Sequence, residues 1–413
     1  MRGAVRALIA LGSATAVWLG LLHLLFMADL DDFFGGDSGL RPGAASLAAR
    51  HVKMWSEPTL KELELKKMRQ SNAEWDFMGR TFLVLALANM SLRDPGSADK
   101  YVDVIDRIID ETIKIEAEHG VYYFLMPYAR ERPFMAKSGR SIFVDGEIAL
   151  MLAARRIVRE SDEYATLLEQ RLDSMVHQMK DSPVMCSESY PDECWMFCNA
   201  VGMAALRMSD VLDGTDHSEF ISDWLASIKR NLVDSDTGML ISSFSVDGQA
   251  FDGPEGSSIW MVAHCLDLVD PEFARDQYCR ARQELGRSVL GFGYAREWPR
   301  SWQSPADVDS GPIIPVLEMS AGSSGMAVLG AASFEDREFL LGLMTSLKFA
   351  GFPVRRDGEL KFCASNQVGD AVLLYAMVQG PVWASVKRRW NEAHVSSVGW
   401  VDKSVPVAAA GEL

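Results

Sequence analysis

From residue 44 onward, apolar residues recur at intervals of three and four positions, which is the spacing of amphipathic helices. Ile105, Ile108, Ile109 and Ile113 form one such apolar face. Predicted helices end at turn signals such as Asp213-Gly214. The pattern predicts helices over residues 44–55, 58–71, 75–92, 97–117, 143–159, 162–180, 194–213, 216–232, 256–269, 271–287, 312–331, 334–348, 366–379 and 381–392.

These helices follow one another without a polar linker, so they predict one domain over residues 44–395, followed by a tail over 396–413. Their number and length, arranged as antiparallel pairs, predict an all-α fold, an (α/α)6 barrel or toroid. A helical solenoid is the alternative, but no repeat of about 30–45 residues shows the self-similarity of such arrays. Short strands are expected only at 121–126 and 239–246. An active site is expected in the loops between helices, at 121–142, 182–193, 235–255 and 289–311.

The N-terminus carries a long apolar run. Arg2 and Arg6 precede 22 uncharged residues, from Ala7 to Ala28, and Asp29 follows. A helix needs about twenty residues to cross the hydrocarbon core, and flanking positive charge stays in the cytoplasm. We therefore expect a transmembrane signal anchor over 1–28, a linker over 29–43, and a soluble domain on the periplasmic or extracytoplasmic side. A cleaved signal peptide is the alternative, because Ala14-Thr15-Ala16 has the small-x-small form, although it precedes the most hydrophobic part.

Composition excludes several classes of function. The net charge is −16 and no basic stripe is present, which argues against nucleic acid as a partner. Seven histidines and six cysteines form no HExxH or paired CxxC motif, so we expect no metal site. No glycine-rich phosphate loop follows a strand, so nucleotide binding has no support.

Four polar segments interrupt the apolar pattern. In the first, Asp76 lies between aromatic residues and four positions before Arg80, which favours an ion pair; a carboxylate in an apolar pocket, with a shifted pKa, is the alternative. In the second, Glu147 falls in the first turn of an apolar helix. There it is either a helix-dipole partner or a group that faces a pocket. The third segment contains Cys186, Cys194 and Cys198. The fourth contains Glu297 and Asp309.

Taken together, these segments resemble the linalool dehydratase/isomerase family. The best stretch runs through YPD at 190–192, CNAV at 198–201 and VLDGTD at 211–216. Weaker likeness covers GEIALM at 146–151 and SSIW at 257–260. The resemblance implies an (α/α)6 barrel, no cofactor, a hydrophobic cavity that isomerises or dehydrates a small terpene alcohol, and homo-oligomers.

The family's site residues include an aspartate, a histidine, two cysteines and tyrosines. Cys198 matches the second cysteine, and Cys186 matches the first if three residues are inserted; without them Ser189 falls there. Asp76 is the match for the aspartate. Glu147 occupies the histidine position, and Gly256 stands where a tyrosine is expected.

The resulting hypothesis is a cofactor-free lyase/isomerase of a small hydrophobic alkenol or terpenoid. An acid protonates the leaving hydroxyl, and a base takes a carbon-bound proton. The expected catalytic residues are Asp76, Glu147, Cys186 and Cys198, which should converge in one cavity. The alternatives are a carbohydrate-active (α/α)6 barrel, such as a glycosidase or epimerase, and a non-catalytic protein that binds hydrophobic ligands. Residues expected to bind the substrate are Trp75, Phe77, Trp195, Phe197, Glu297 and Asp309.

Overall fold

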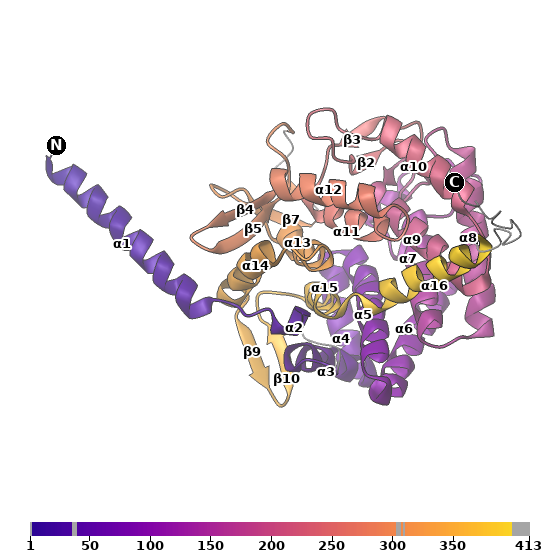
Figure 1. Ribbon diagram of the computed structural model, residues 1–413, viewed down its shortest axis with the longest axis horizontal. Coiled ribbons are helices and arrows are strands. Elements are labelled where there is room, and N and C mark those ends of the chain that lie inside the picture. The colour runs from indigo at the N-terminus through magenta and orange to yellow at the C-terminus, as the bar shows by residue number, and fades with distance from the viewer. Residues whose placement is uncertain (1, 35–38, 303–306, 309, 399–413) are drawn as a thin grey trace, which may run out of the picture.

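A computed structural model describes residues 2–34, 39–302, 307–308 and 310–398 of the 413-residue chain. Six of its helices form the inner layer of a barrel, in which each helix packs against the next and the last closes the ring against the first. The predicted (α/α)6 barrel is therefore confirmed (Figure 1). The inner helices are α5 (Ala73–Arg93), α7 (Ile142–Val158), α9 (Met196–Asp213), α11 (Gly256–Leu266), α13 (Ala321–Ser333) and α15 (Gln367–Val378).

The outer layer alternates with the inner one along the chain. α6, α8, α12 and α14 each pack on the inner helix that precedes them, and α3 packs on α15. The outer helices are α3 (Pro42–Ser56), α6 (Ala98–His119), α8 (Asp162–Asp181), α10 (Ser218–Asn231), α12 (Pro271–Glu284) and α14 (Arg337–Ala350). Two further helices, α4 (Pro58–Ser71) and α16 (Pro381–Val398), contact α5.

The sequence explains why the inner helices are inside. They are apolar nearly all round, as in the fully buried run from Phe82 to Met90, and a helix without a polar face must be covered on all sides. Gly146 and Gly202 let α7 and α9 approach closely, since a Cβ at Gly146 would lie 3.4 Å from the Gly202 nitrogen. Side-chain caps begin three inner helices: Asn72 for α5, Ser320 for α13 and Asn366 for α15.

Short antiparallel strands precede four inner helices, so they form part of the rim at the helix N-termini. A three-stranded sheet contains β1 (Cys194–Trp195), β2 (Ser243–Phe244) and β3 (Ala250–Asp252). A five-stranded sheet has the order β4 (Gly286–Val289), β5 (Phe292–Arg296), β8 (Met319–Ser320), β7 (Gly311–Ile314) and β6 (Asp307–Val308). The hairpin of β9 (Pro353–Arg356) and β10 (Glu359–Phe362) precedes α15.

The strand predictions were largely wrong. Residues 121–126, expected as a strand, begin with the 3-10 helix η2 (Val121–Tyr123), and only β2 lies within 239–246. The segment 289–311, expected as a loop, contributes to the five-stranded sheet, and α13 starts at Ala321 instead of at 312. Strands of two to five residues give too short an alternating pattern to be recognised.

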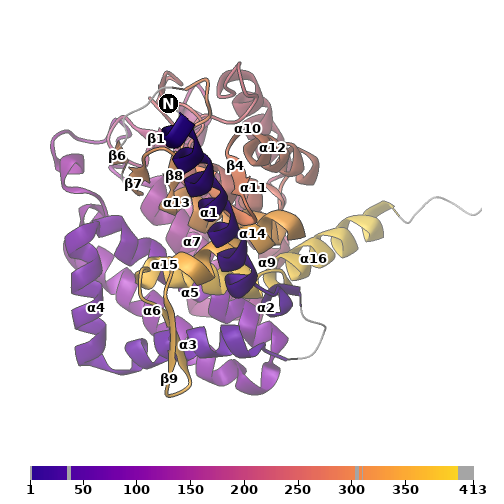
Figure 2. The same ribbon diagram turned by 90° about the vertical axis from the view of Figure 1, so that its left-hand side faces the viewer.

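Helix α1 (Arg2–Phe26) projects from the domain, and Figure 2 views the domain from that side. Among the described residues, the segment Gly3–Phe34 alone contains a helix long and apolar enough to cross a membrane, with a mean hydropathy of 1.9. The expected linker contains helix α2 (Asp31–Phe34), whose Phe33 is buried. The Ala28 N–H also donates to the Thr345 hydroxyl at 3.2 Å, so this segment packs against the barrel.

Candidate active site

Glu147 lies in the second turn of α7, inside the ring of inner helices. Its side chain is 1% exposed. The Thr81 hydroxyl acts on the carboxyl as a hydrogen-bond donor, but within the described residues no hydrogen bond of regular geometry reaches either oxygen. It interacts electrostatically with Thr81 of α5, Cys198 of α9 and Cys265 of α11. Because α7 has α5 and α9 as its neighbours in the ring and α11 lies beyond α9, a side chain that reaches all three points into the barrel.

Burial determines the protonation states of Glu147, Cys198 and Cys265, which we call the buried cluster. Burial raises the pKa of Glu147 to about 8; the Thr81 hydroxyl lowers this pKa, and Glu74 raises it further. Glu147 is therefore mostly protonated at neutral pH. Burial also raises the pKa of Cys198 and of Cys265 well above the usual range, and Glu147 adds to both shifts. Both thiols are thus neutral, and the cluster holds at least one transferable proton.

Three cysteines gather where α9 begins. Cys194 interacts electrostatically with both Cys186 and Cys198, and all three thiols are buried and free. Burial raises the pKa of Cys186 to about 12, while the Trp224 indole of α10 lowers it. Cys186 thus lies toward the outer layer of helices. Of the two cysteines expected in the site, Cys198 is the one that lies beside Glu147.

Asp76 does not join this cluster. It accepts a hydrogen bond from Arg80 Nε at 2.9 Å and lies 3.5 Å from Arg69. Arg80 continues to Glu111 and Thr112 of α6. The structure thus gives Asp76 the ion pair that its spacing to Arg80 favoured, on the face of α5 toward the outer layer.

Glu74 occupies the other face of α5. Residues two positions apart in a helix are separated by about 200° around its axis, so Glu74 points away from Asp76. Tyr190 donates a hydrogen bond to Glu74 Oε1 and accepts one from the Met126 N–H at 3.0 Å. Burial raises the pKa of Tyr190 far above its usual range, and Glu74 adds to this. Sequence reasoning missed Glu74, although its helical spacing to Thr81 was a usable signal.

The four expected aromatic residues make separate contacts. Phe77 is fully buried and stacks on Phe124 with ring centroids 4.4 Å apart. The Trp195 indole donates to Glu193 Oε1 at 2.5 Å. Trp75 is partly buried, and Phe197 is buried at the start of α9. Their predicted role in substrate binding stays a prediction.

Glu297 joins the N-termini of two inner helices. It is 1% exposed and accepts hydrogen bonds from the Ser257 N–H of α11 at 2.8 Å and from the hydroxyl of Ser320, which caps α13. This carboxylate therefore holds the rim together. Asp309, the other acid expected there, lies outside the described residues.

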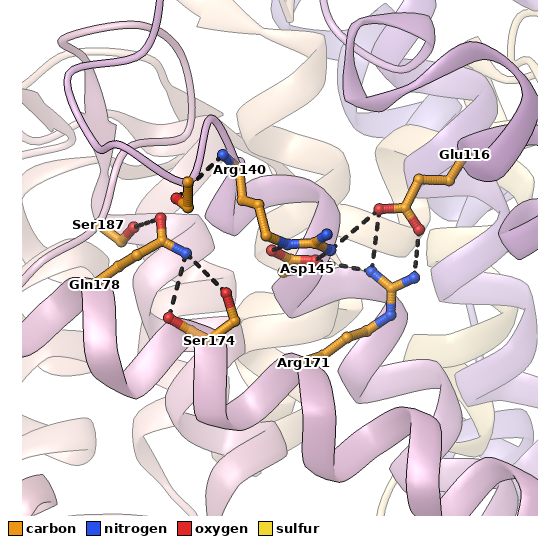
Figure 3. A network of polar contacts seen from close by, with 8 residues as sticks. Glu116, Arg140, Asp145, Arg171, Ser174, Gln178 and Ser187 are labelled. Atoms are coloured by element: carbon orange, nitrogen blue, oxygen red, sulfur yellow. Dashed lines mark hydrogen bonds and ion pairs between the residues drawn. The ribbon is translucent and has the colours of Figure 1, made fainter.

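The start of α7 is fixed by a buried ion network, shown in Figure 3. Asp145 accepts hydrogen bonds from Arg140 and, at 2.8 Å, from Arg171 of α8. Both arginines also reach Glu116 of α6. The network ties α7 to two outer helices only two residues before Glu147, so it restricts the position of that side chain.

Gly256 lies at the first position of α11, where the helix passes close to β5 and α13. A Cβ at this position would overlap the carbonyl oxygen of Arg296 and the Ser323 hydroxyl. The local packing therefore requires glycine, and the tyrosine expected from the resemblance does not fit this backbone.

The family model of linalool dehydratase/isomerase matches residues 147–364, which is more than half of the chain. The chain belongs to the linalool dehydratase/isomerase family. The match begins at Glu147 and includes Cys186, Cys198 and Gly256. Among the described residues, no three His, Cys, Asp or Glu side chains are grouped so that they could hold a metal ion.

A solved structure shares the fold of this linalool dehydratase/isomerase family member. An unsaturated glucuronyl hydrolase from Bacillus sp. GL1 matches with a TM-score of 0.50 and 13% identity, over 82% of this chain and 94% of that chain. A GH76 α-mannanase from Bacteroides thetaiotaomicron matches with a TM-score of 0.47 and 12% identity, over 76% and 87%. At 13% identity the likeness to the hydrolase concerns the barrel fold alone.

Proposed function

We propose that this chain is a cofactor-free lyase/isomerase that dehydrates a small hydrophobic alkenol or terpenoid, or shifts its hydroxyl, with Glu147 as the acid. The observation that carries the proposal is the burial of Glu147 inside the barrel, which raises its pKa to about 8 although the Thr81 hydroxyl lowers that pKa. Such a carboxyl is protonated at neutral pH and available to a ligand. Membership of the family supports the reaction class.

In the proposed reaction, Glu147 donates its proton to the hydroxyl oxygen of the substrate. The carbon–oxygen bond then breaks, water leaves with the bonding electron pair, and the allylic carbons carry the positive charge. A base takes a proton from the neighbouring carbon, and the electrons of that C–H bond form the second double bond. In the isomerisation, water adds instead to the other end of the allylic system and returns a proton to Glu147.

Glu74 is the proposed base. It lies on the inward face of α5 and interacts electrostatically with Glu147, and Tyr190 holds one of its oxygens. The thiols of Cys198 and Cys265 suit a different role. Their raised pKa values keep them neutral and make them poor proton donors as well, so they serve as polarisable walls.

Activity of the purified protein on a panel of allylic alcohols, including linalool, tests the proposal. Gas chromatography of the products should show dienes or shifted alcohols. Glu147→Gln should lower turnover by about 10²–10⁴-fold, the usual contribution of a general acid. Glu169→Gln, at an exposed position of α8, is the matched control and should keep full activity. Full activity of Glu147→Gln would contradict the assignment.

A carbohydrate-active enzyme is the second candidate, because the glucuronyl hydrolase has the same fold and because two carboxyl groups, Glu74 and Glu147, lie close enough to interact. The same panel extended with saturated and unsaturated glycosides separates the two. Glycoside hydrolysis without alkenol turnover would replace the proposal. Binding of alkenols without any turnover would instead indicate a non-catalytic ligand-binding protein.

We also propose that α1 anchors the domain to the membrane with its N-terminus in the cytoplasm, so that the barrel is extracytoplasmic. Arg2 and Arg6 at its start and the acidic residues after its end support this orientation.

A further inference from the structure

Exposed apolar side chains surround the point where α1 leaves the domain. They come from the turn between β4 and β5, from the end of α14 and from β9. Phe349, Phe352 and Val354 line one groove together with Leu25, Phe26 and Met27 of the N-terminal segment. The exposed fractions are 48% for Leu290, 65% for Phe352 and 49% for Val354. We call Val289, Leu290, Phe349, Phe352 and Val354 the apolar patch.

Contacts between α1 and the barrel show which part of α1 lies beside the apolar patch. The His23 ring packs edge-on against Phe292 with centroids 5.7 Å apart, and it lies against Gly291. Phe26 makes a similar contact with Phe349 at 5.3 Å. His23 lies three residues before the end of α1, which is about 4.5 Å along the helix. The β4–β5 turn therefore lies beside the last turn of the apolar helix α1, on the N-terminal side of its end.

The backbone at two patch residues is unfavourable for the side chains it carries. Leu290 and Gly291 form a turn with φ values of 50° and 83°, a conformation that favours Asn-Gly. Phe352 also has a positive φ, of 49°. A left-handed conformation is unfavourable for a bulky residue, and within this chain both side chains remain exposed. Neither turn chemistry nor internal packing explains a leucine and a phenylalanine at these positions.

We propose that the apolar patch inserts into the interfacial layer of the bilayer that holds α1, so that the barrel lies against the membrane. The proposal rests on the anchor proposed above. The patch continues the apolar surface of α1, whose side chains are exposed along the helix, and one bilayer covers both.

Charged residues beside the patch fit this arrangement. Lys348 and Arg355 line the same groove, together with Asp29 and Asp32. Lys348 lies 3.7 Å from Asp29, and Arg355 donates to the Ser46 hydroxyl at 3.3 Å. Lys348 is partly neutralised by its neighbour, so we expect apolar insertion, more than charge, to hold the domain on the lipid.

Spin-label accessibility in the full-length protein tests the proposal. Cys279 and Cys363, the exposed cysteines of the described chain, are first replaced by serine. Single cysteines are then introduced as Leu290→Cys and Phe352→Cys, and the protein is reconstituted in phosphatidylcholine vesicles. Ser13→Cys within α1 is the membrane reference. Thr166→Cys on α8, on the opposite side of the domain from α1 in Figure 1, is the water reference. Relaxation by oxygen, which concentrates in lipid, is compared with relaxation by a water-soluble nickel chelate.

The labels at 290 and 352 should be relaxed more by oxygen and less by the chelate than the label at 166, with a ratio of the two effects between those of the labels at 13 and 166. If the label at 13 is in lipid but those at 290 and 352 are in water, the patch does not insert, and the anchor stands alone. If the label at 13 is in water, the anchor proposal fails and this one with it. Labels at 290 and 352 that are shielded from both reagents and coupled to each other across molecules would show that a second copy covers the patch, which also overturns the proposal.

Discussion

A buried carboxyl that is not paired with a cation can remain in a folded protein only if it is neutral or if a ligand satisfies it. Ionisation of such a group costs several kcal/mol, because the protein interior solvates charge poorly. Glu147 avoids most of this cost by staying protonated up to a pH of about 8, the value to which its pKa is raised. The same property makes it a proton donor under physiological conditions, so its burial serves the proposed reaction.

The raised pKa of Glu147 predicts a pH-dependent loss of stability. Between about pH 4.5 and 8, the unfolded chain releases this proton and the folded chain retains it, so folding is penalised increasingly as pH rises. At about 1.4 kcal/mol per pH unit, the penalty reaches on the order of 4–5 kcal/mol above pH 8. Glu147→Gln removes this dependence. The free energy of unfolding of the variant minus that of the native protein should therefore be larger at pH 8.5 than at pH 5.5. Urea unfolding at both values measures it, and an unchanged difference would contradict the raised pKa.

The sequence was informative about some site residues and misleading about others. Glu147 and Cys198 were both expected, and the structure brings them together. Asp76 was expected beside them because of the family resemblance, whereas its spacing to Arg80 pointed to an ion pair, which is what the structure contains. Glu74 was missed because an acid in the first turn of a helix is usually explained by the helix dipole. The convergence of distant helices cannot be read from local spacing.

At the scale of elements, the inner helices were the most predictable part. Their apolar residues cover the whole circumference, which requires burial inside an outer layer. The rim strands were not predictable, since the turn between β4 and β5 contains Leu290-Gly291 and lacks the usual Asn-Gly signal. The close approach of α11 to α13 at Gly256 was also hidden, because it depends on residues far apart in sequence.

Two glycine substitutions test the packing of the inner helices. Gly256→Ala should lower the free energy of unfolding by about 1–3 kcal/mol, since the new Cβ would overlap a backbone carbonyl and a buried serine. Gly325→Ala in α13 is the matched control. Nothing lies within 4 Å of its Cβ position, so alanine should stabilise the helix by up to about 1 kcal/mol. Chemical denaturation measures the free energies of unfolding of both variants. Equal effects would show that the contact at Gly256 is not tight.

At the scale of the whole molecule, the sequence predicted the closed barrel and the apolar N-terminal helix, but not how the two are joined. Residues 29–43 were expected to be a tether. In the structure, Phe33 of this segment is buried, and the N–H of the preceding Ala28 donates a hydrogen bond to Thr345 of α14. These contacts could not be predicted, because a short polar segment gives no sign of which surface it packs on.

The anchor and its orientation predict the behaviour of the full-length protein in cells. It should remain in the membrane fraction after alkaline extraction, because α1 is exposed and apolar along the length of a bilayer crossing. Cys279, which is exposed on α12, should react with a membrane-impermeant thiol reagent in cells whose inner membrane is intact. Labelling that requires permeabilisation would place the domain in the cytoplasm. Recovery of a mature N-terminus between residues 20 and 35 would show that the segment is cleaved.

Infrared spectroscopy tests most directly whether Glu147 is a protonated acid inside the barrel. The carbonyl stretch of a protonated carboxyl group is separate from that of a carboxylate, and the difference spectrum between the native protein and Glu147→Gln isolates this one group. A protonated band should be present at pH 7 and be lost with a midpoint near pH 8. A carboxylate band already present at pH 6 would contradict it.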